Sequence, residues 1–405
     1  MSAKPTRGRQ TQATQTYTDG ERKQRPLSIP IVQAVNFEAE SSRRLGEDFR
    51  KRDEHVYLRF GHPTTKAAGD KIALLEGAEA GLVFGSGMGA VSTSLMALAG
   101  KAGGHVVAQR QIFGQTFTFL DQTLRGLGVE TTFVEGTDLA EWRGAFRPNT
   151  VLAYIETPSN PVIKVIDIAA VSAIAREHRV PLAVDSTFAS PVLQNPIELG
   201  ASLVLHSATK FLAGHSDVMC GAAAGSKELI ARIHHMQELL GTVLDPHAAW
   251  LLLRGIKTLG VRVMRQSESA LEIARRLESS PDVAAVHYPF LESSLYFATA
   301  SRQMRGGGGV LSFVARGGIQ AARRFVDALE LIPTATSLGG VESVIEIPAD
   351  LDWSEEELGE AAADTGIPAG LIRLSVGIED LDDLLADVDR GLKAMRAGAK
   401  TSSAA

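Results

Sequence analysis

The stretch Ala201-Ser-Leu-Val-Leu-His-Ser-Ala-Thr-Lys210 joins an apolar run to two hydroxyl side chains and a lysine. The apolar part, up to Leu205, predicts a short buried strand, because polar residues end it at once. Lys210 therefore follows a strand end, where burying an ammonium group is costly. An enzyme that needs a nucleophilic amine benefits from that burial, because loss of hydration lowers the lysine pKa. The stretch indicates a reactive lysine, with an ordinary loop lysine as the alternative.

Apolar runs of the same kind recur on the N-terminal side of this stretch, separated by segments with helical periodicity. The runs cover residues 81–84, 105–108, 151–155 and 181–184. Strands that alternate with helices predict an α/β fold, in which helices cover both faces of a mostly parallel sheet. Ligands of such sheets bind beyond the carboxyl ends of the strands. We therefore expect functional residues directly after the apolar runs.

The remainder of the chain predicts a smaller second domain. A long helical stretch over 247–278 is followed by the alternating strand 310–314 and a final strand–helix unit that begins at Leu371. This mixture is typical of an α+β domain. We expect three parts: an N-terminal arm over 1–60 that contacts a neighbouring subunit, a large domain over 61–250 and a C-terminal domain over 251–405.

Composition narrows the classes of function. The 405 residues carry a net charge of −6, which gives no electrostatic basis for binding nucleic acid. The sequence contains no run of about 18 apolar residues, so no membrane-spanning helix is expected. The basic residues 1–25 lack the apolar segment of a secretory signal and predict a flexible arm, with a transit peptide as the alternative. Cys220 is the only cysteine, which favours a cytoplasmic location. We expect no membrane partner, no nucleic-acid partner and no metal site.

Two further strand ends complete a chemical constellation with Lys210. Asp185 closes an apolar run and can pair with a pyridinium nitrogen, which makes the ring an electron sink; a helix cap or an ion pair is the alternative. The stretch Phe84-Gly-Ser-Gly-Met-Gly89 predicts a strand, a glycine-rich turn and a helix, an arrangement that binds anions. Ser207 and Thr209 offer hydroxyl groups to phosphate oxygens. Together these features indicate pyridoxal 5′-phosphate (PLP) as the cofactor.

A nicotinamide-dependent oxidoreductase is the rival class for the glycine-rich turn. Its fingerprint is Gly-x-Gly-x-x-Gly, with an acidic residue at the end of the next strand. The chain has Gly-x-Gly-x-Gly from Gly85 to Gly89, and Gln109-Arg110 after the next apolar run. The sequence therefore disfavours this class. The complete set of cofactor residues likewise disfavours a non-catalytic binding protein.

The motifs resemble those of the Cys/Met-metabolism family of PLP enzymes. This family includes cystathionine γ-synthase, cystathionine γ-lyase, methionine γ-lyase and the O-acylhomoserine sulfhydrylases, and the resemblance runs over about residues 30–392. The motifs that carry it are Tyr57-Leu-Arg59, Ser86-Gly-Met88, Glu156-Thr-Pro-Ser-Asn-Pro161, Val184-Asp185, His206-Ser-Ala-Thr-Lys210, Ser337-Leu-Gly-Gly340 and Arg373-Leu-Ser-Val-Gly-Ile-Glu-Asp380. The resemblance implies PLP fold type I, as in aspartate aminotransferase, with a large α/β domain and a smaller C-terminal α+β domain.

The resemblance also implies roles for individual residues. Lys210 would form the Schiff base with PLP, and Asp185 would bind the pyridine nitrogen. The phosphate ligands would be Gly87, Met88, Ser207 and Thr209, joined from the neighbouring subunit by Tyr57 and Arg59. The residues that orient the cofactor and bind the substrate α-carboxylate would be Asn160, Ser337 and Arg373. Active sites shared in this way imply a dimer, or the homotetramer usual in this family.

Departures from the family pattern bear on the reaction. Phe113 stands where most members have a tyrosine, so this candidate catalytic residue can stack on the cofactor but cannot transfer a proton. Thr118 and Thr336 replace charged residues of other members, and 348–353 departs from the usual substrate-pocket motif. We expect γ-replacement on an activated homoserine through a vinylglycine species, as in O-acylhomoserine sulfhydrylases or cystathionine γ-synthase. The alternatives are a cystathionine or methionine γ-lyase and a γ-replacement with another leaving group, such as the sulfonium of S-adenosylmethionine.

Overall fold

The computed structural model describes residues 7–17, 24–52, 54–352 and 366–402, and these form two compact units. Unit 1 comprises residues 1–156 and 167–260, and unit 2 comprises residues 157–166 and 261–405. The chain therefore leaves unit 1 at the end of one strand, contributes ten residues to unit 2 and then returns. The expected three-part division at residues 60 and 250 stays a prediction.

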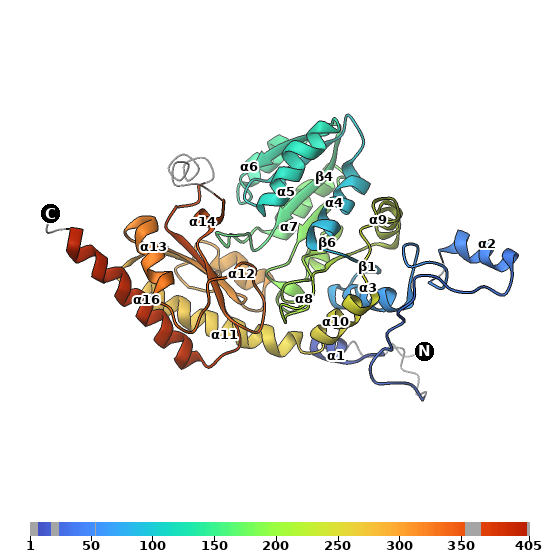
Figure 1. Ribbon diagram of the computed structural model, residues 1–405. Coiled ribbons are helices and arrows are strands. Elements are labelled where there is room, and N and C mark those ends of the chain that lie inside the picture. The colour runs from blue at the N-terminus through green and yellow to red at the C-terminus, as the bar shows by residue number, and fades with distance from the viewer. Residues whose placement is uncertain (1–6, 18–23, 53, 353–365, 403–405) are drawn as a thin grey trace. The chain divides into compact units, whose positions relative to one another are not determined.

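Unit 1 is built around a seven-stranded sheet with the strand order β1-β7-β6-β5-β4-β2-β3 (Figure 1). The strands are β1 (Ala80–Phe84), β2 (His105–Gln109), β3 (Glu130–Val134), β4 (Thr150–Glu156), β5 (Leu182–Asp185), β6 (Leu203–His206) and β7 (Gly221–Gly225). Neighbours from β3 to β6 run parallel, and β7 is antiparallel to both β6 and β1. The five apolar runs thus form β1, β2, β4, β5 and β6, because each is a short segment buried between helices.

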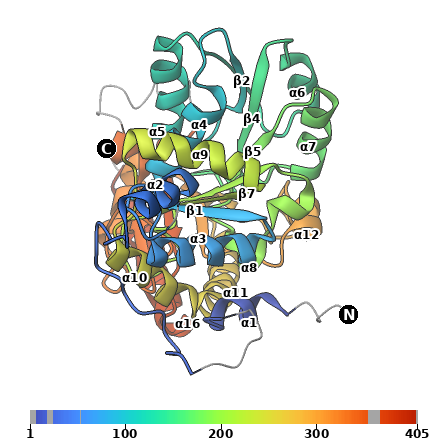
Figure 2. The same ribbon diagram turned by 90° about the vertical axis from the view of Figure 1, so that its right-hand side faces the viewer.

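Helices lie on both faces of this sheet (Figure 2). One face is covered by α4 (Gly87–Ala99), α5 (Gly114–Thr118), the π-helical turn η1 (Phe119–Leu124) and α9 (Lys227–Leu240). The other face carries α3 (Pro63–Glu76), α8 (Ser190–Leu193) and α10 (Pro246–Ile256). The helices α6 (Leu139–Ala145) and α7 (Ile168–Glu177) pack against each other, and η2 (Pro196–Leu199) follows α8. Apolar side chains between these layers form the core.

The helical stretch expected over 247–278 is two helices. The first, α10, ends at Ile256, and α11 (Leu259–Glu278) begins three residues later. At Gly255 an added Cβ would lie 2.1 Å from the carbonyl oxygen of Ala213. Gly255 is therefore needed for close packing against another segment of the backbone.

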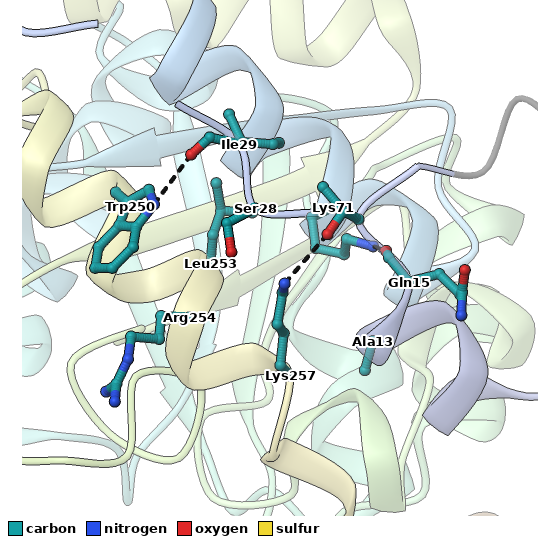
Figure 3. A pocket seen from close by; sticks show the side chains of 10 residues that line it. Ala13, Gln15, Ser28, Ile29, Lys71, Trp250, Leu253, Arg254 and Lys257 are labelled. Carbon is teal, nitrogen blue, oxygen red and sulfur yellow. Dashed lines mark hydrogen bonds between the residues drawn. The ribbon is translucent and has the colours of Figure 1, made fainter. Parts of the chain in front are cut away.

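The N-terminal segments lie against the body of unit 1. Helix α1 (Arg9–Thr14) ends beside Lys71, whose ammonium group donates hydrogen bonds to the carbonyl oxygens of Gln12 (2.6 Å) and Gln15 (2.5 Å). Trp250 donates to the carbonyl oxygen of Ile29 (3.0 Å), and both residues line a cavity of about 180 Å³ (Figure 3). Burial, together with the nearby charge of Lys257, lowers the pKa of Lys71 to about 8. A further short helix, α2 (Ser42–Lys51), follows in the same N-terminal part.

Unit 2 contains a four-stranded antiparallel sheet in the order β10-β11-β9-β8. Its strands are β8 (Val283–His287), β9 (Val310–Ala315), β10 (Val344–Glu346) and β11 (Leu371–Ser375). Its helices, besides most of α11, are α12 (Phe297–Gln303), α13 (Gly318–Asp327), α14 (Pro348–Asp352) and α16 (Leu381–Ser402). Helices α13 and α16 lie side by side (Figure 1) and bury an apolar core with the sheet. This unit has the α+β character expected from the sequence.

Among the residues that the structure describes, no helix combines the length and the apolar character that a bilayer span requires.

Candidate active site

Lys210 lies four residues beyond the end of β6, at the carboxyl edge of the parallel strands. The segment turns sharply there: the backbone N–H of Lys210 donates to the carbonyl of Ser207 (3.1 Å), and that of Gly214 donates to the carbonyl of Lys210 (2.8 Å). The side chain is half-buried. A nucleophilic amine on a rigid turn at this edge suits Schiff-base chemistry.

Asp185 ends β5, and the residue is 7% exposed. Only one carboxylate oxygen, Oδ1, accepts hydrogen bonds from described residues, and both come from Thr187: one from its backbone N–H (2.9 Å) and one from its hydroxyl (2.6 Å). Burial raises the pKa of Asp185, and the bonds from Thr187 and the charge of His206 oppose that rise. A cationic ring nitrogen beside the other oxygen would stabilise the ionised form. The carboxylate therefore fits a pyridinium partner.

An anion cradle lies where α4 begins. The hydroxyl of Ser86 caps the helix by accepting from the N–H of Gly89 (2.9 Å), so the N–H groups of Gly87 and Met88 remain without a partner inside the helix. Ser207 lies directly against this helix start, because a Cβ added to Gly87 would be 2.6 Å from its Oγ. The Ser207 hydroxyl forms no hydrogen bond within the described chain, so two N–H groups and one hydroxyl are available to a phosphate group.

Thr209 makes different contacts from Ser207. Its hydroxyl donates to the carbonyl of Cys220 (3.1 Å) and accepts from the N–H of the same residue (2.9 Å). The single hydroxyl proton of Thr209 is therefore used to fasten the Lys210 turn to the segment before β7. Its expected role as a phosphate ligand stays a prediction.

Phe113 lies directly before α5, with 42% of its surface exposed. Its backbone N–H donates to the carboxylate of Glu156 (2.9 Å). Glu156 ends β4 and is the register partner of Asp185, so the start of α5 is held at the sheet edge where Asp185 lies. The exposed ring offers area for stacking on an aromatic cofactor.

Glu156 and Thr187 contact the candidate site residues Phe113 and Asp185, although neither was predicted from the sequence. Glu156 opens a family motif, and Thr187 follows Asp185 by two residues. Those positions were the available clues. Glu156 acts through a hydrogen bond to Phe113, a residue far from it in the chain, whereas Thr187 bonds to Asp185 only two residues away.

Tyr57 and Arg59 lie in another part of unit 1. Arg59 donates from Nη1 to the carbonyl of Glu238 near the end of α9 (3.0 Å), and its guanidinium lies over the ring of Phe60. The Tyr57 side chain is 39% exposed. Within the described residues, no hydrogen bond joins either side chain to the cradle at Gly87, and their expected contact with a neighbouring subunit stays a prediction.

Unit 2 brings the three expected substrate residues together. Arg373, on β11, donates from Nη1 to Asn160 Oδ1 (2.8 Å) and from Nη2 to the carbonyl of Ser337 (2.9 Å). Arg373 is buried, and its guanidinium also pairs with Glu346. A planar, fixed guanidinium suits a carboxylate ligand. Of the departures noted in the sequence, Thr118 and Thr336 are exposed, and Trp353 lies outside the described residues.

Comparison with known proteins identifies the family. The profile of the family described as Cys/Met metabolism PLP-dependent enzyme matches residues 10–393. An L-methionine gamma-lyase of Pseudomonas deceptionensis is 44% identical over 344 residues, 84% of this chain and 86% of the relative. A cystathionine beta-lyase of Lactococcus lactis is 42% identical over 370 residues, 91% of this chain and 94% of the relative. The structure of cystathionine gamma-lyase from Lactobacillus plantarum has a TM-score of 0.88 and 36% identity, covering 96% of this chain and 100% of that one.

These similarities settle the fold, the cofactor and the class of protein. The expected PLP fold type I is confirmed, because a solved family member matches nearly the whole chain. PLP is the cofactor, and the donor set at Gly87, Met88 and Ser207, the buried Asp185 and the amine of Lys210 fit its phosphate, pyridine nitrogen and aldehyde. The protein is an enzyme, as expected. The chain belongs to the Cys/Met metabolism family of PLP-dependent enzymes.

Proposed function

We propose that this enzyme is a γ-lyase that acts on methionine or a related amino acid and releases a thiol, a 2-oxo acid and ammonia. The observation that carries the proposal is the 44% identity to L-methionine gamma-lyases over 84% of the chain. The comparisons thus favour the γ-lyase alternative over the expected γ-replacement, which becomes the second candidate.

The residues of unit 1 have distinct roles in this proposal. Bound PLP withdraws electrons from the α-carbon of the substrate, which makes the neighbouring hydrogens acidic. Asp185 would stay ionised beside the ring nitrogen, and the N–H groups of Gly87 and Met88 with the Ser207 hydroxyl would hold the phosphate. The amine of Lys210 removes the proton at Cα and moves protons at the adjacent carbons. Phe113 supplies stacking area without a titratable group.

In unit 2, Arg373 is proposed to bind the substrate α-carboxylate. Its guanidinium is held by Asn160 and by the carbonyl of Ser337, at 2.8 Å and 2.9 Å. Because a fixed guanidinium loses little freedom when it binds a carboxylate, this arrangement favours the amino acid in a single orientation.

Gamma-replacement is supported by one specific observation, the phenylalanine at position 113. A tyrosine hydroxyl beside the cofactor can assist departure of a leaving group, and acid–base assistance is worth about 10²–10⁴-fold in rate. Without it, a poor leaving group such as a thiolate departs less readily than the carboxylate that leaves the γ-carbon of an O-acylhomoserine. The candidate reactions therefore differ in the substrate that reacts fastest.

The test is a product analysis by mass spectrometry with methionine, cystathionine, S-adenosylmethionine and two O-acylhomoserines, each with and without a saturating thiol. The γ-lyase proposal expects 2-oxo acid from methionine or cystathionine as the main product, also when thiol is present. If the main product is instead a thioether made from an O-acylhomoserine, the γ-lyase proposal is wrong and the enzyme catalyses γ-replacement. Phe113→Tyr should increase 2-oxo acid formation, and Phe113→Ala should weaken PLP retention and slow all reactions.

We also propose that the enzyme is a homo-oligomer with shared active sites and that it works in the cytoplasm. Mixing inactive Arg59→Ala and Lys210→Ala subunits under conditions of exchange should restore part of the activity, because hybrid pairs contain one complete site. No recovery despite proven exchange would mean that Arg59 serves its own chain. The cytoplasmic location rests on composition, above all on the single cysteine.

A further inference from the structure

Glu346 lies directly opposite Arg373 in the sheet of unit 2. It is the last residue of β10, and the antiparallel register pairs it with Arg373 on β11. Its Oε1 is 2.8 Å from Nη2 of Arg373, and the two side chains are 9% and 6% exposed. This is a buried ion pair at the residue assigned to the substrate carboxylate.

The guanidinium of Arg373 is also held by two uncharged acceptors. Asn160 Oδ1 accepts from Nη1, and the carbonyl of Ser337 accepts from Nη2. Ser337 has a φ of 81°, a left-handed conformation that is strained for a residue other than glycine. Of these three partners, only Glu346 changes the net charge that an approaching carboxylate meets.

We propose that Glu346 sets the affinity of the enzyme for amino-acid carboxylates: it orients the guanidinium of Arg373 and also offsets its charge. The proposal rests on the proposed function only in taking Arg373 as the ligand of the α-carboxylate. A carboxylate that approaches a bare guanidinium meets a full positive charge. A carboxylate that approaches the Arg373–Glu346 ion pair meets a net charge near zero, and the Glu346 carboxylate repels it.

Orientation and charge compensation can be separated by substitution. Glu346→Gln keeps the side-chain length and an oxygen that accepts from Nη2, but it removes the negative charge. Glu346→Leu removes both the charge and the acceptor. If Glu346 has the two roles, the substitutions change carboxylate affinity in opposite directions. A residue that only supports the fold would lower the affinity, or leave it unchanged, in both variants.

The experiment measures ligand dissociation constants of the PLP-loaded enzyme from the change in cofactor absorbance. The probes are L-norleucine, which has the α-carboxylate but no leaving group, and n-pentylamine, which is the same molecule without the carboxylate. For Glu346→Gln we expect L-norleucine to bind at least about fivefold more tightly. For Glu346→Leu we expect it to bind at least about tenfold more weakly. Binding of n-pentylamine should change less than twofold in both.

The matched control is Glu342→Gln, which removes an equal charge from an exposed side chain four residues earlier. It should bind both probes as the wild type does. Unchanged or weaker binding of L-norleucine by Glu346→Gln would overturn the proposal, as would equal shifts for both probes. If Glu346→Leu does not fold, the Glu346→Gln result decides alone.

The outcome is independent of which reaction the enzyme catalyses, because L-norleucine undergoes neither γ-elimination nor γ-replacement. If methionine gave no 2-oxo acid, the proposed function would be wrong while the binding comparison still decided the role of Glu346. If Arg373→Ala left L-norleucine binding unchanged, the carboxylate assignment would be wrong, and the proposal for Glu346 would fail with it.

Discussion

Replacing Gly87 with alanine should weaken PLP binding, because the first turn of α4 touches Ser207. The new Cβ would lie 2.6 Å from Oγ, 2.7 Å from Cβ and 3.0 Å from Cα of Ser207. Rotating the serine side chain relieves only the first contact, because the other two atoms move with the backbone. The turn that carries Ser207 must therefore shift away from the helix.

The size of the effect follows from that shift. Overpacking of this kind costs about 1–3 kcal/mol. The apoenzyme relieves the overlap by moving the Ser207 turn, whereas phosphate binding needs the Gly87 N–H and the Ser207 hydroxyl to converge again. The cost therefore appears in binding, as a PLP dissociation constant about 5- to 150-fold higher.

The assay is a titration of the apoenzyme with PLP, followed by visible absorbance. Gly144→Ala is the matched control, because Gly144 lies in α6 and an added Cβ meets nothing within 4 Å. The control should bind PLP as the wild type does. If the folded Gly87→Ala variant has a PLP dissociation constant within twofold of the wild type, the predicted shift of the Ser207 turn is wrong. The assignment of Gly87 and Ser207 to phosphate binding would then be wrong as well.

Three further predictions concern single side chains. Lys210→Ala should abolish turnover and the borohydride-reducible cofactor adduct, and an adduct at another lysine on peptide mapping would contradict the assignment. Asp185→Asn should retain PLP but lose most exchange of the substrate Cα hydrogen, measured in deuterium oxide, since the ring nitrogen loses its anionic partner; exchange at the wild-type rate would rule this role out. Between pH 8 and 10.5 Lys71 is protonated in the unfolded chain but has lost its proton in the folded protein. The free energy of unfolding should therefore rise with pH across this range, by up to ~3 kcal/mol relative to Lys71→Met. Urea unfolding of both proteins at pH 7.5 and 10 measures this difference, and parallel pH dependences would contradict it.

The placement of Asp185 and Lys210 at strand ends was predictable from the sequence, because it depends on local patterns. Asp185 and Lys210 come directly after apolar runs, and such runs form buried parallel strands whichever helices cover them. The same rule found the glycine-rich start of α4, where a strand, a cap and a helix are consecutive in the chain. The reaction was harder to predict, because members with different reactions share the same cofactor and the departure at Phe113 is a single side chain.

What the sequence by itself determined is thus the α/β fold, the cofactor and the residues at the strand ends, because each depends on short stretches of chain. Only the tertiary structure decided the contacts between distant segments. Thr209 bonds to Cys220, and the predicted long helix ends at Ile256. Lys71 bonds to a carbonyl of α1, and Glu346 lies opposite Arg373. These contacts depend on strand register and on the close approach of backbones, which side-chain pattern along one segment does not encode.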